Sequence, residues 1–156
     1  MKETARIAEL FEKIYNGDSW IGESLLNTLE NIPAESVAKR IAPRWNTAWE
    51  IVNHIISWRE NVLQRVQGTV THEPDDNYIT PVKDTSEKAW QKTLQALKNS
   101  QEKWIAFLQK MDEEDLEKIY ANKYSSYYNN IHGIIQHDAY HLGQIILLVK
   151  NTVDNE

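Results

Sequence analysis

Two histidines near the C-terminus occupy positions where the surrounding apolar pattern points inward. His137 and His141 lie between Ile134 and Ile145 on one face of a predicted helix. Residues four apart on a helix point about 40° apart and are separated by about 6 Å along the axis, so both imidazoles can bind one metal ion. The chain has no cysteine, and any metal site must therefore use His, Asp or Glu.

His54 repeats this pattern on an earlier predicted helix, where it shares a face with Ile51, Ile55 and Trp58. A single histidine on an apolar face is more often a hydrogen-bonded core residue than a ligand, but three buried imidazoles would each need partners. Three neutral imidazoles with one open position are typical of a catalytic zinc site. Imidazole also suits nickel, copper and iron, and we expect zinc or nickel here.

Gln144 and Glu50 are the candidates for a catalytic role beside these ligands. Gln144 can hydrogen-bond a metal-bound group, although a helix-packing hydrogen bond is the commoner role. Glu50 can act as a base or as a carboxylate supporting a ligand, and a solvated place at the helix start is at least as common. Asp138 points about 100° away from His137, where it either orients an imidazole of another helix or is an exposed charge.

The remaining histidines are predicted to lie outside the cluster. His132 points about 140° away from His137 and is interpreted as a capping, surface or supporting residue. His72 lies in an acidic loop and is expected to be solvated. Three aromatic residues either line a pocket or, more commonly for such residues, pack into the core: Trp20, Trp58 and Tyr140.

Helices are predicted to position all these residues, because Gly and Pro are scarce, at five and four, and apolar residues recur at helical spacing. The predicted helices span residues 3–16, 19–31, 47–67, 85–110 and 129–151, with a short helix at 112–118 and loops at 69–83 and 119–128. Asn46 is a predicted cap, and Asp84 with Glu87 has the spacing of a capping box. The predicted inward residues of the first two helices are Ile7, Leu10, Phe11, Ile14, Trp20, Leu25, Leu26 and Leu29.

These lengths fit an all-α four-helix bundle, and 156 residues is the usual size of one domain, here 1–156. The loop at 69–83 is long enough to run back along the bundle. The helix pattern alone therefore allows either an up-down-up-down order or a crossover.

Charge and hydropathy exclude several classes of protein. The net charge is −6 and no basic block occurs, which argues against nucleic-acid binding. No apolar run approaches the roughly 20 residues that span a bilayer, and the N-terminus does not resemble a signal peptide. A cytoplasmic protein without membrane or nucleic-acid partners is expected.

The run HDAYHLGQI at residues 137–145 resembles the C-terminal H-x-x-x-H-x-G-Q signature of the DinB superfamily, the DinB/YfiT-like metalloenzymes. Residues 49–58 resemble the helix of that family in which a histidine precedes an aromatic residue by four, and residues 17–25 also resemble family members. The resemblance implies a bundle of up-down-down-up order with long loops after the second and third long helices. It also implies a divalent metal bound by His54, His137 and His141.

Relatives of known activity include thiol S-transferases that use bacillithiol and a mycothiol-dependent maleylpyruvate isomerase, and dimers are common among them. We therefore expect a metal-dependent enzyme that acts on a small molecule, with a low-molecular-weight thiol as partner, and a homodimer. A metal-dependent hydrolase and a non-catalytic module that binds a metal or ligand are the alternatives.

Overall fold

The computed structural model describes residues 1–121 and 125–153, and the regular elements in these residues are helices apart from one isolated bridge between Ile119 and Ser126. The four principal helices are α1 (Glu3–Asn16), α4 (Ala48–Val66), α5 (Glu87–Lys110) and α6 (Tyr127–Val153). Three short elements connect them: α2 (Leu25–Leu29), α3 (Ala34–Ala38) and the 3-10 helix η1 (Glu113–Glu117). No helix among the described residues is long and apolar enough to cross a bilayer.

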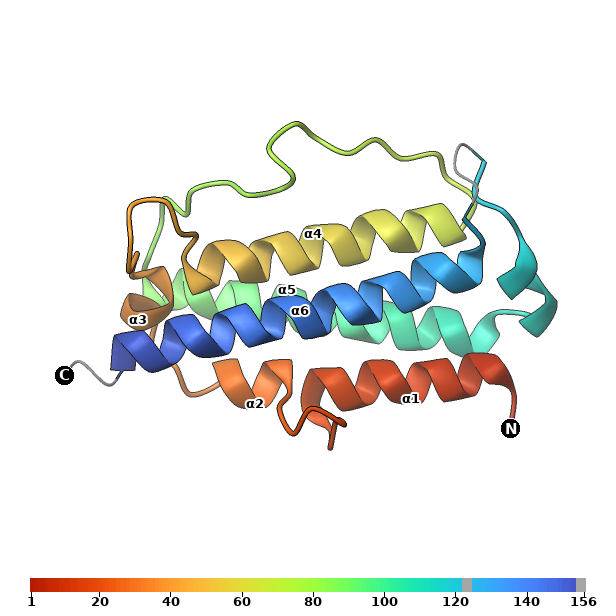
Figure 1. Cartoon of the computed structure of the whole chain (residues 1–156), viewed down its shortest axis with the longest axis horizontal. Coiled ribbons are helices and arrows are strands. Elements are labelled where there is room, and N and C mark those ends of the chain that lie inside the picture. Colours follow the sequence, from red (N-terminus) through yellow and green to blue (C-terminus); the bar gives the residue numbers. More distant parts are fainter. Residues whose placement is uncertain (122–124, 154–156) are drawn as a thin grey trace.

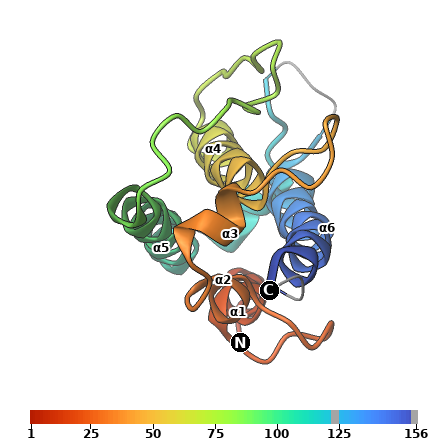
Figure 2. The same ribbon diagram turned by 90° about the vertical axis from the view of Figure 1, so that its left-hand side faces the viewer.

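The helix order is up-down-down-up, as the family resemblance implies. In Figure 1, α1 and α6 run toward the left of the view, whereas α4 and α5 run toward the right. Because α4 and α5 are parallel, residues 67–86 have to travel back along the bundle, and they do so as the long loop predicted for 69–83. Seen end-on in Figure 2, α4 packs between α5 and α6, with α1 opposite.

Buried tryptophans organise the core into two halves. In one half, Trp49 meets the edge of Trp90 at a ring-centroid distance of 5.1 Å, and in the other Phe11 stacks on Trp104 at 4.8 Å. Each indole N–H group donates a hydrogen bond. Trp49 donates to Thr93 Oγ1, Trp90 to the Ile32 carbonyl and Trp104 to the Arg59 carbonyl. The rings therefore bury large apolar areas without leaving a donor unpaired.

A polar layer separates the two halves of the core. Arg59 of α4 places Nε and Nη2 at 2.9 and 2.8 Å from Asp138 Oδ2 of α6, and its Nη1 donates to Gln101 Oε1 of α5 at 3.0 Å. The side chains of the ion pair are fully buried. Burial raises the pKa of Asp138, and the adjacent guanidinium opposes that rise. A shifted helix register would leave a charge buried without its partner, so this layer fixes α4, α5 and α6 relative to one another.

The predicted helix at 19–31 is wrong in its first half. Gly22 has a φ of +76° and Ser24 is extended, so the helix α2 begins only at Leu25. Trp20, predicted to face the core, lies before this break and is 100% exposed. Leu10 is also exposed, whereas its predicted core partners Ile7, Phe11 and Ile14 are buried.

The predicted caps of the two parallel helices are also wrong. Thr47, not Asn46, caps α4, because Thr47 Oγ1 accepts from the Glu50 amide and Glu50 Oε2 accepts from the Thr47 amide in a capping box. Ser86 caps α5 by accepting from the Ala89 amide. Asp84 accepts from the Ser86 amide instead of closing a box with Glu87.

The last two helical predictions agree with the structure within a few residues. The short helix predicted at 112–118 is η1, and α6 begins at Tyr127 rather than at 129. Part of the predicted loop at 119–128, residues 122–124, lies outside the described residues, as do residues 154–156.

Replacing Asp138 by Asn should destabilise the fold by about 3–5 kcal/mol, because the buried Arg59 charge would lose its counter-ion. Urea unfolding followed by circular dichroism measures this loss. The double variant Arg59→Met, Asp138→Leu should be less destabilised than Asp138→Asn, since it buries no charge. Glu102→Ala, at an exposed pair with Lys98, is the matched control and should change stability little. A loss below about 1 kcal/mol for Asp138→Asn would contradict this role.

Candidate metal centre

Three imidazoles meet in the seam between α4 and α6. His54 comes from the middle of α4, and His137 and His141 come from successive turns of α6. His54 Nε2 lies 3.0 Å from His137 Nε2 and 3.1 Å from His141 Nε2. One nitrogen of each ring lies within 4.8 Å of the others, so the group can hold a metal ion. The structure thus brings together the three residues that the sequence singles out.

Hydrogen bonds on the far sides of two rings set their tautomers. His54 Nδ1 lies 2.7 Å from the Asn77 carbonyl, which can only accept, so Nδ1 carries the proton. His141 Nδ1 likewise donates to Gln144 Oε1 at 2.7 Å, while Gln144 Nε2 donates to the Tyr140 hydroxyl. The Nε2 atoms of His54 and His141 therefore present lone pairs to each other at 3.1 Å. Such an arrangement is repulsive by itself and is favourable around a cation, so this donor set fits a divalent metal.

Burial keeps the cluster in the uncharged form that binds metals. Burial lowers the pKa of His137 to about 3, assisted by His141, His54 and the Arg59 guanidinium. Burial also lowers the pKa values of His54 and His141, which their hydrogen bonds to Asn77 and Gln144 partly oppose. Nδ1 of His137 is buried and has no hydrogen-bond partner among the described residues. All three rings are thus neutral at neutral pH.

The long loop supplies a support for His54 that sequence reasoning missed. Asn77 and Tyr78 have φ values of 52° and 59°, a left-handed conformation that is uncommon for residues other than glycine. This turn directs the Asn77 carbonyl at His54 and Asn77 Oδ1 at the indole N–H of Trp58, at 3.0 Å. Asn61 Nδ2 donates to the Tyr78 hydroxyl at 2.8 Å and holds the turn against α4. No side-chain pattern signals this contact, because every residue has a carbonyl.

The two catalytic candidates have different surroundings. Gln144 contacts the cluster through its hydrogen bond to His141. Glu50 is only 3% exposed, so a solvated position is wrong, and its carboxylate oxygens bind the Thr47 amide and Arg40 Nη2. Asp138 is buried against Arg59, so its predicted exposure is wrong and its described contacts include no imidazole.

The other candidates lie around the cluster or away from it. Trp58 is half-buried and turns its edge toward His54, at a ring-centroid distance of 6.4 Å. Tyr140 is 65% exposed and lies beside His141. His132 packs against Tyr128 with the two rings tilted by 41°, and its Nε2 lacks a hydrogen-bond partner among the described residues. His72 is exposed, as predicted.

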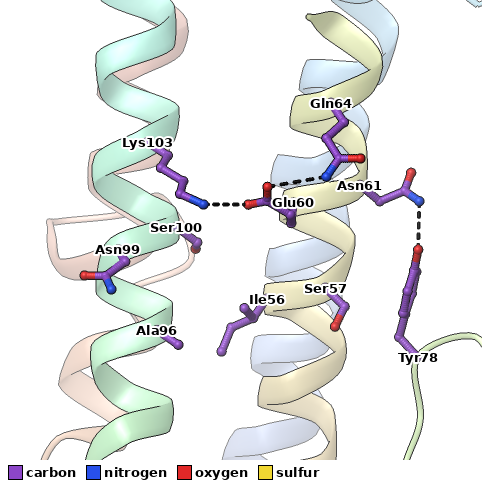
Figure 3. A pocket seen from close by; sticks show the side chains of 10 residues that line it. All are labelled: Ile56, Ser57, Glu60, Asn61, Gln64, Tyr78, Ala96, Asn99, Ser100 and Lys103. Atoms are coloured by element: carbon purple, nitrogen blue, oxygen red, sulfur yellow. Dashed lines mark hydrogen bonds and ion pairs between the residues drawn. The ribbon is translucent and has the colours of Figure 1, made fainter. Parts of the chain in front are cut away.

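Hollows occur on both sides of α4. One of about 560 Å³ lies between α4 and α5, where Lys103 pairs with Glu60 across it, and Figure 3 shows that side chains of both helices and Tyr78 line it. None of the three clustered histidines lines this hollow. Another, of about 340 Å³, lies in the α4–α6 seam and includes Gln144 in its lining.

Comparison with known proteins identifies the family of this chain and a protein that shares its fold. A family model described as the DinB superfamily matches residues 19–145, which is most of the chain. The chain belongs to the DinB superfamily. A search of curated proteins gives no significant match to this DinB chain. A crystal structure described as a conserved protein of locus from Enterococcus faecalis superposes with a TM-score of 0.74, covers 99% of both chains and is 13% identical, which shows a shared fold.

Removing the hydrogen bond to His141 should weaken metal binding without removing a ligand. Gln144→Ala frees the imidazole to turn, and loss of such a supporting partner typically costs about 10–100-fold in affinity. Gln144→Glu keeps an acceptor for the Nδ1 proton and should restore most of the affinity. Zinc competition titrations measure the change, with Gln136→Ala, an exposed glutamine of α6, as the control. Equal affinities for Gln144→Ala and the control would rule out this positioning role.

The metal-free DinB chain should lose stability as the pH falls below about 6.5. The three imidazoles have lowered pKa values in the folded chain. At a pH between the pKa of the unfolded chain and that of the folded chain, the unfolded chain therefore binds more protons. For His137 this loss continues toward its folded value of about 3. Melting temperatures from about pH 8 to about pH 5 test this. His137→Gln should make the slope shallower, whereas His72→Gln, an exposed histidine, should leave it unchanged.

Proposed function

We propose that this DinB-superfamily chain binds one divalent transition metal, zinc or nickel, through Nε2 of His54, His137 and His141. The observation that carries the proposal is the pair of facing Nε2 lone pairs, 3.1 Å apart, whose orientation is imposed by Asn77 and Gln144. Metal–imidazole bonds of about 2.0–2.1 Å can span such a separation around a single ion.

We further propose that the site serves a metal-dependent transfer of a low-molecular-weight thiol to a small electrophile. A divalent metal held by three neutral ligands would act as a Lewis acid that lowers the pKa of a bound thiol or water. The cluster contains only histidines among the described residues, and the nearby carboxylates of Glu50 and Asp138 are engaged by other groups. Neither of these two carboxylates is therefore available as a base for the nucleophile.

We propose a thiol rather than water as the nucleophile because DinB relatives of known activity include thiol S-transferases. A zinc ion can lower the pKa of bound water to about 7, and a free thiol has a pKa of about 8.5, so a metal ion held here could supply either nucleophile near neutral pH. The sulfur would then attack an electrophilic carbon, the leaving group would depart with its bonding electrons, and the thiol proton would pass to solvent. Trp58 and Tyr140 flank the cluster and would limit the access of water to it.

Metal analysis of the purified protein beside two variants tests the first step. The wild-type chain, supplied with zinc or nickel, should retain about one equivalent after dialysis. His137→Ala removes a ligand, so its metal affinity should fall by more than the roughly 10–100-fold that is typical when a residue supporting a ligand is lost. The control His72→Ala should retain the metal as the wild type does. A wild type that retains neither metal would refute the site.

Mass spectrometry of the same samples separates the reaction classes. Incubation with a low-molecular-weight thiol and a halogenated or epoxide substrate should give a thiol adduct only with the metal-loaded chain. A hydrolysed substrate would instead identify a hydrolase, and equal turnover with and without metal would exclude both enzymes.

A further inference from the structure

We propose that the hollow of about 340 Å³ in the α4–α6 seam binds a small organic anion with an apolar body. Its walls come from the segment before α4, from the first turns of α4 and from the C-terminal half of α6. The lining residues are Arg44, Trp45, Asn46, Ile51, Gln144, Leu147 and Leu148. The volume lies at the small end of the range of ligand pockets.

The hollow lies one helical turn from the histidine cluster on both helices. Ile51 precedes His54 by three residues on α4, and Gln144 follows His141 by three residues on α6. Gln144 also joins the two sites directly, because it lines the hollow and accepts the hydrogen bond from His141 Nδ1 at 2.7 Å. A molecule in the hollow would therefore lie along the same seam as the cluster.

The chemistry of the lining selects the charge of the ligand. Arg44 is the charged residue among those that line the hollow, although the chain as a whole has a net charge of −6. Arg44 is exposed, and none of the hydrogen bonds or ion pairs among the described residues involves its guanidinium. In the hollow between α4 and α5, by contrast, Lys103 is neutralised by Glu60 (Figure 3). A carboxylate, sulfonate or phosphate is the group that a free guanidinium binds best.

The apolar walls select the rest of the ligand. Trp45 and Leu147 remain 56% and 63% exposed beside the buried Leu148 and Ile51. Exposed aromatic and aliphatic side chains around a concave surface are typical of ligand sites. Asn46 and Gln144 add a few polar groups that can orient the bound molecule.

Hydrogen bonds from Arg40 hold the Trp45 segment in place. Arg40 donates one hydrogen bond to the Trp45 carbonyl and another to Glu50 Oε1 at 2.6 Å. Glu50 in turn belongs to the capping box of α4 and is 3% exposed. Figure 2 shows this segment, in orange, extending outward from the end of the bundle beside α4 and α6. Glu50 therefore supports the wall of the hollow rather than the metal ligands.

Binding of an anion in the hollow does not require a metal in the histidine cluster. Use of the hollow as a substrate site, by contrast, rests on the proposed function. Binding of anilinonaphthalene sulfonate, a fluorescent anion with an apolar body, tests it on the folded chain. The wild type should bind the probe at one site, and Arg44→Gln should weaken binding about tenfold or more. Trp45→Ala should also weaken it. Trp20→Ala is the matched control, because Trp20 is fully exposed and lines a different hollow, beside α1, so it should not contribute to this site.

Two further measurements make the result decisive. The uncharged probe N-phenylnaphthylamine should bind more weakly than the sulfonate and should not respond to Arg44→Gln. Zinc affinity and circular dichroism of Arg44→Gln should match the wild type, which separates failure of the hollow from failure of the metal centre or of the fold. Sulfonate binding that is absent, is unchanged in both Arg44→Gln and Trp45→Ala, or is lost in Trp20→Ala would overturn the proposal.

Discussion

The register between α4 and α6 is the constraint on which the rest of this DinB structure depends. The same two helices carry the buried Arg59–Asp138 pair and the His54–His137–His141 cluster. A slip of one helical turn, about 5.4 Å, would separate both sets at once. The ion pair would then be left as two unpaired buried charges, which is far costlier than the loss of the imidazole contacts alone. The register that brings the ligands together is therefore enforced by residues that do not belong to the cluster.

Electrostatics make the cluster suitable for binding a cation. Arg59 helps to lower the pKa of His137, while Asp138 balances most of the guanidinium charge inside the core. With their Nδ1 protons directed at Asn77 and Gln144, His54 and His141 cannot relieve the repulsion between their Nε2 lone pairs by hydrogen bonding to each other. This repulsion is a small cost of folding, and a bound cation would convert it into attraction.

Residues that obey helical periodicity could be predicted from the sequence, and residues that depend on distant contacts could not. His54, His137 and His141 stood out because each replaces an apolar residue on an inward face, and the long helices followed from the same spacing. The pairing of Arg59 with Asp138 was missed, and Asp138 was expected to be exposed or beside an imidazole, because charged residues are rarely fully buried and only the folded core pairs them. Trp20 was wrongly predicted to face the core, because the helical spacing of apolar residues continues across Gly22. The left-handed conformation of Gly22 breaks the predicted helix at that point.

The connecting segments, rather than the helices, determine what surrounds the cluster. On one side, the turn at Asn77 and Tyr78 lies against α4 and holds both His54 and Trp58. On the other side, the segment held by Arg40 leaves the hollow beside Gln144. The helices need only keep their register to preserve the three ligands, so the loops can change without dismantling the cluster. Selectivity for a substrate is therefore expected to reside in residues 40–47 and 67–86, where surface segments tolerate variation best.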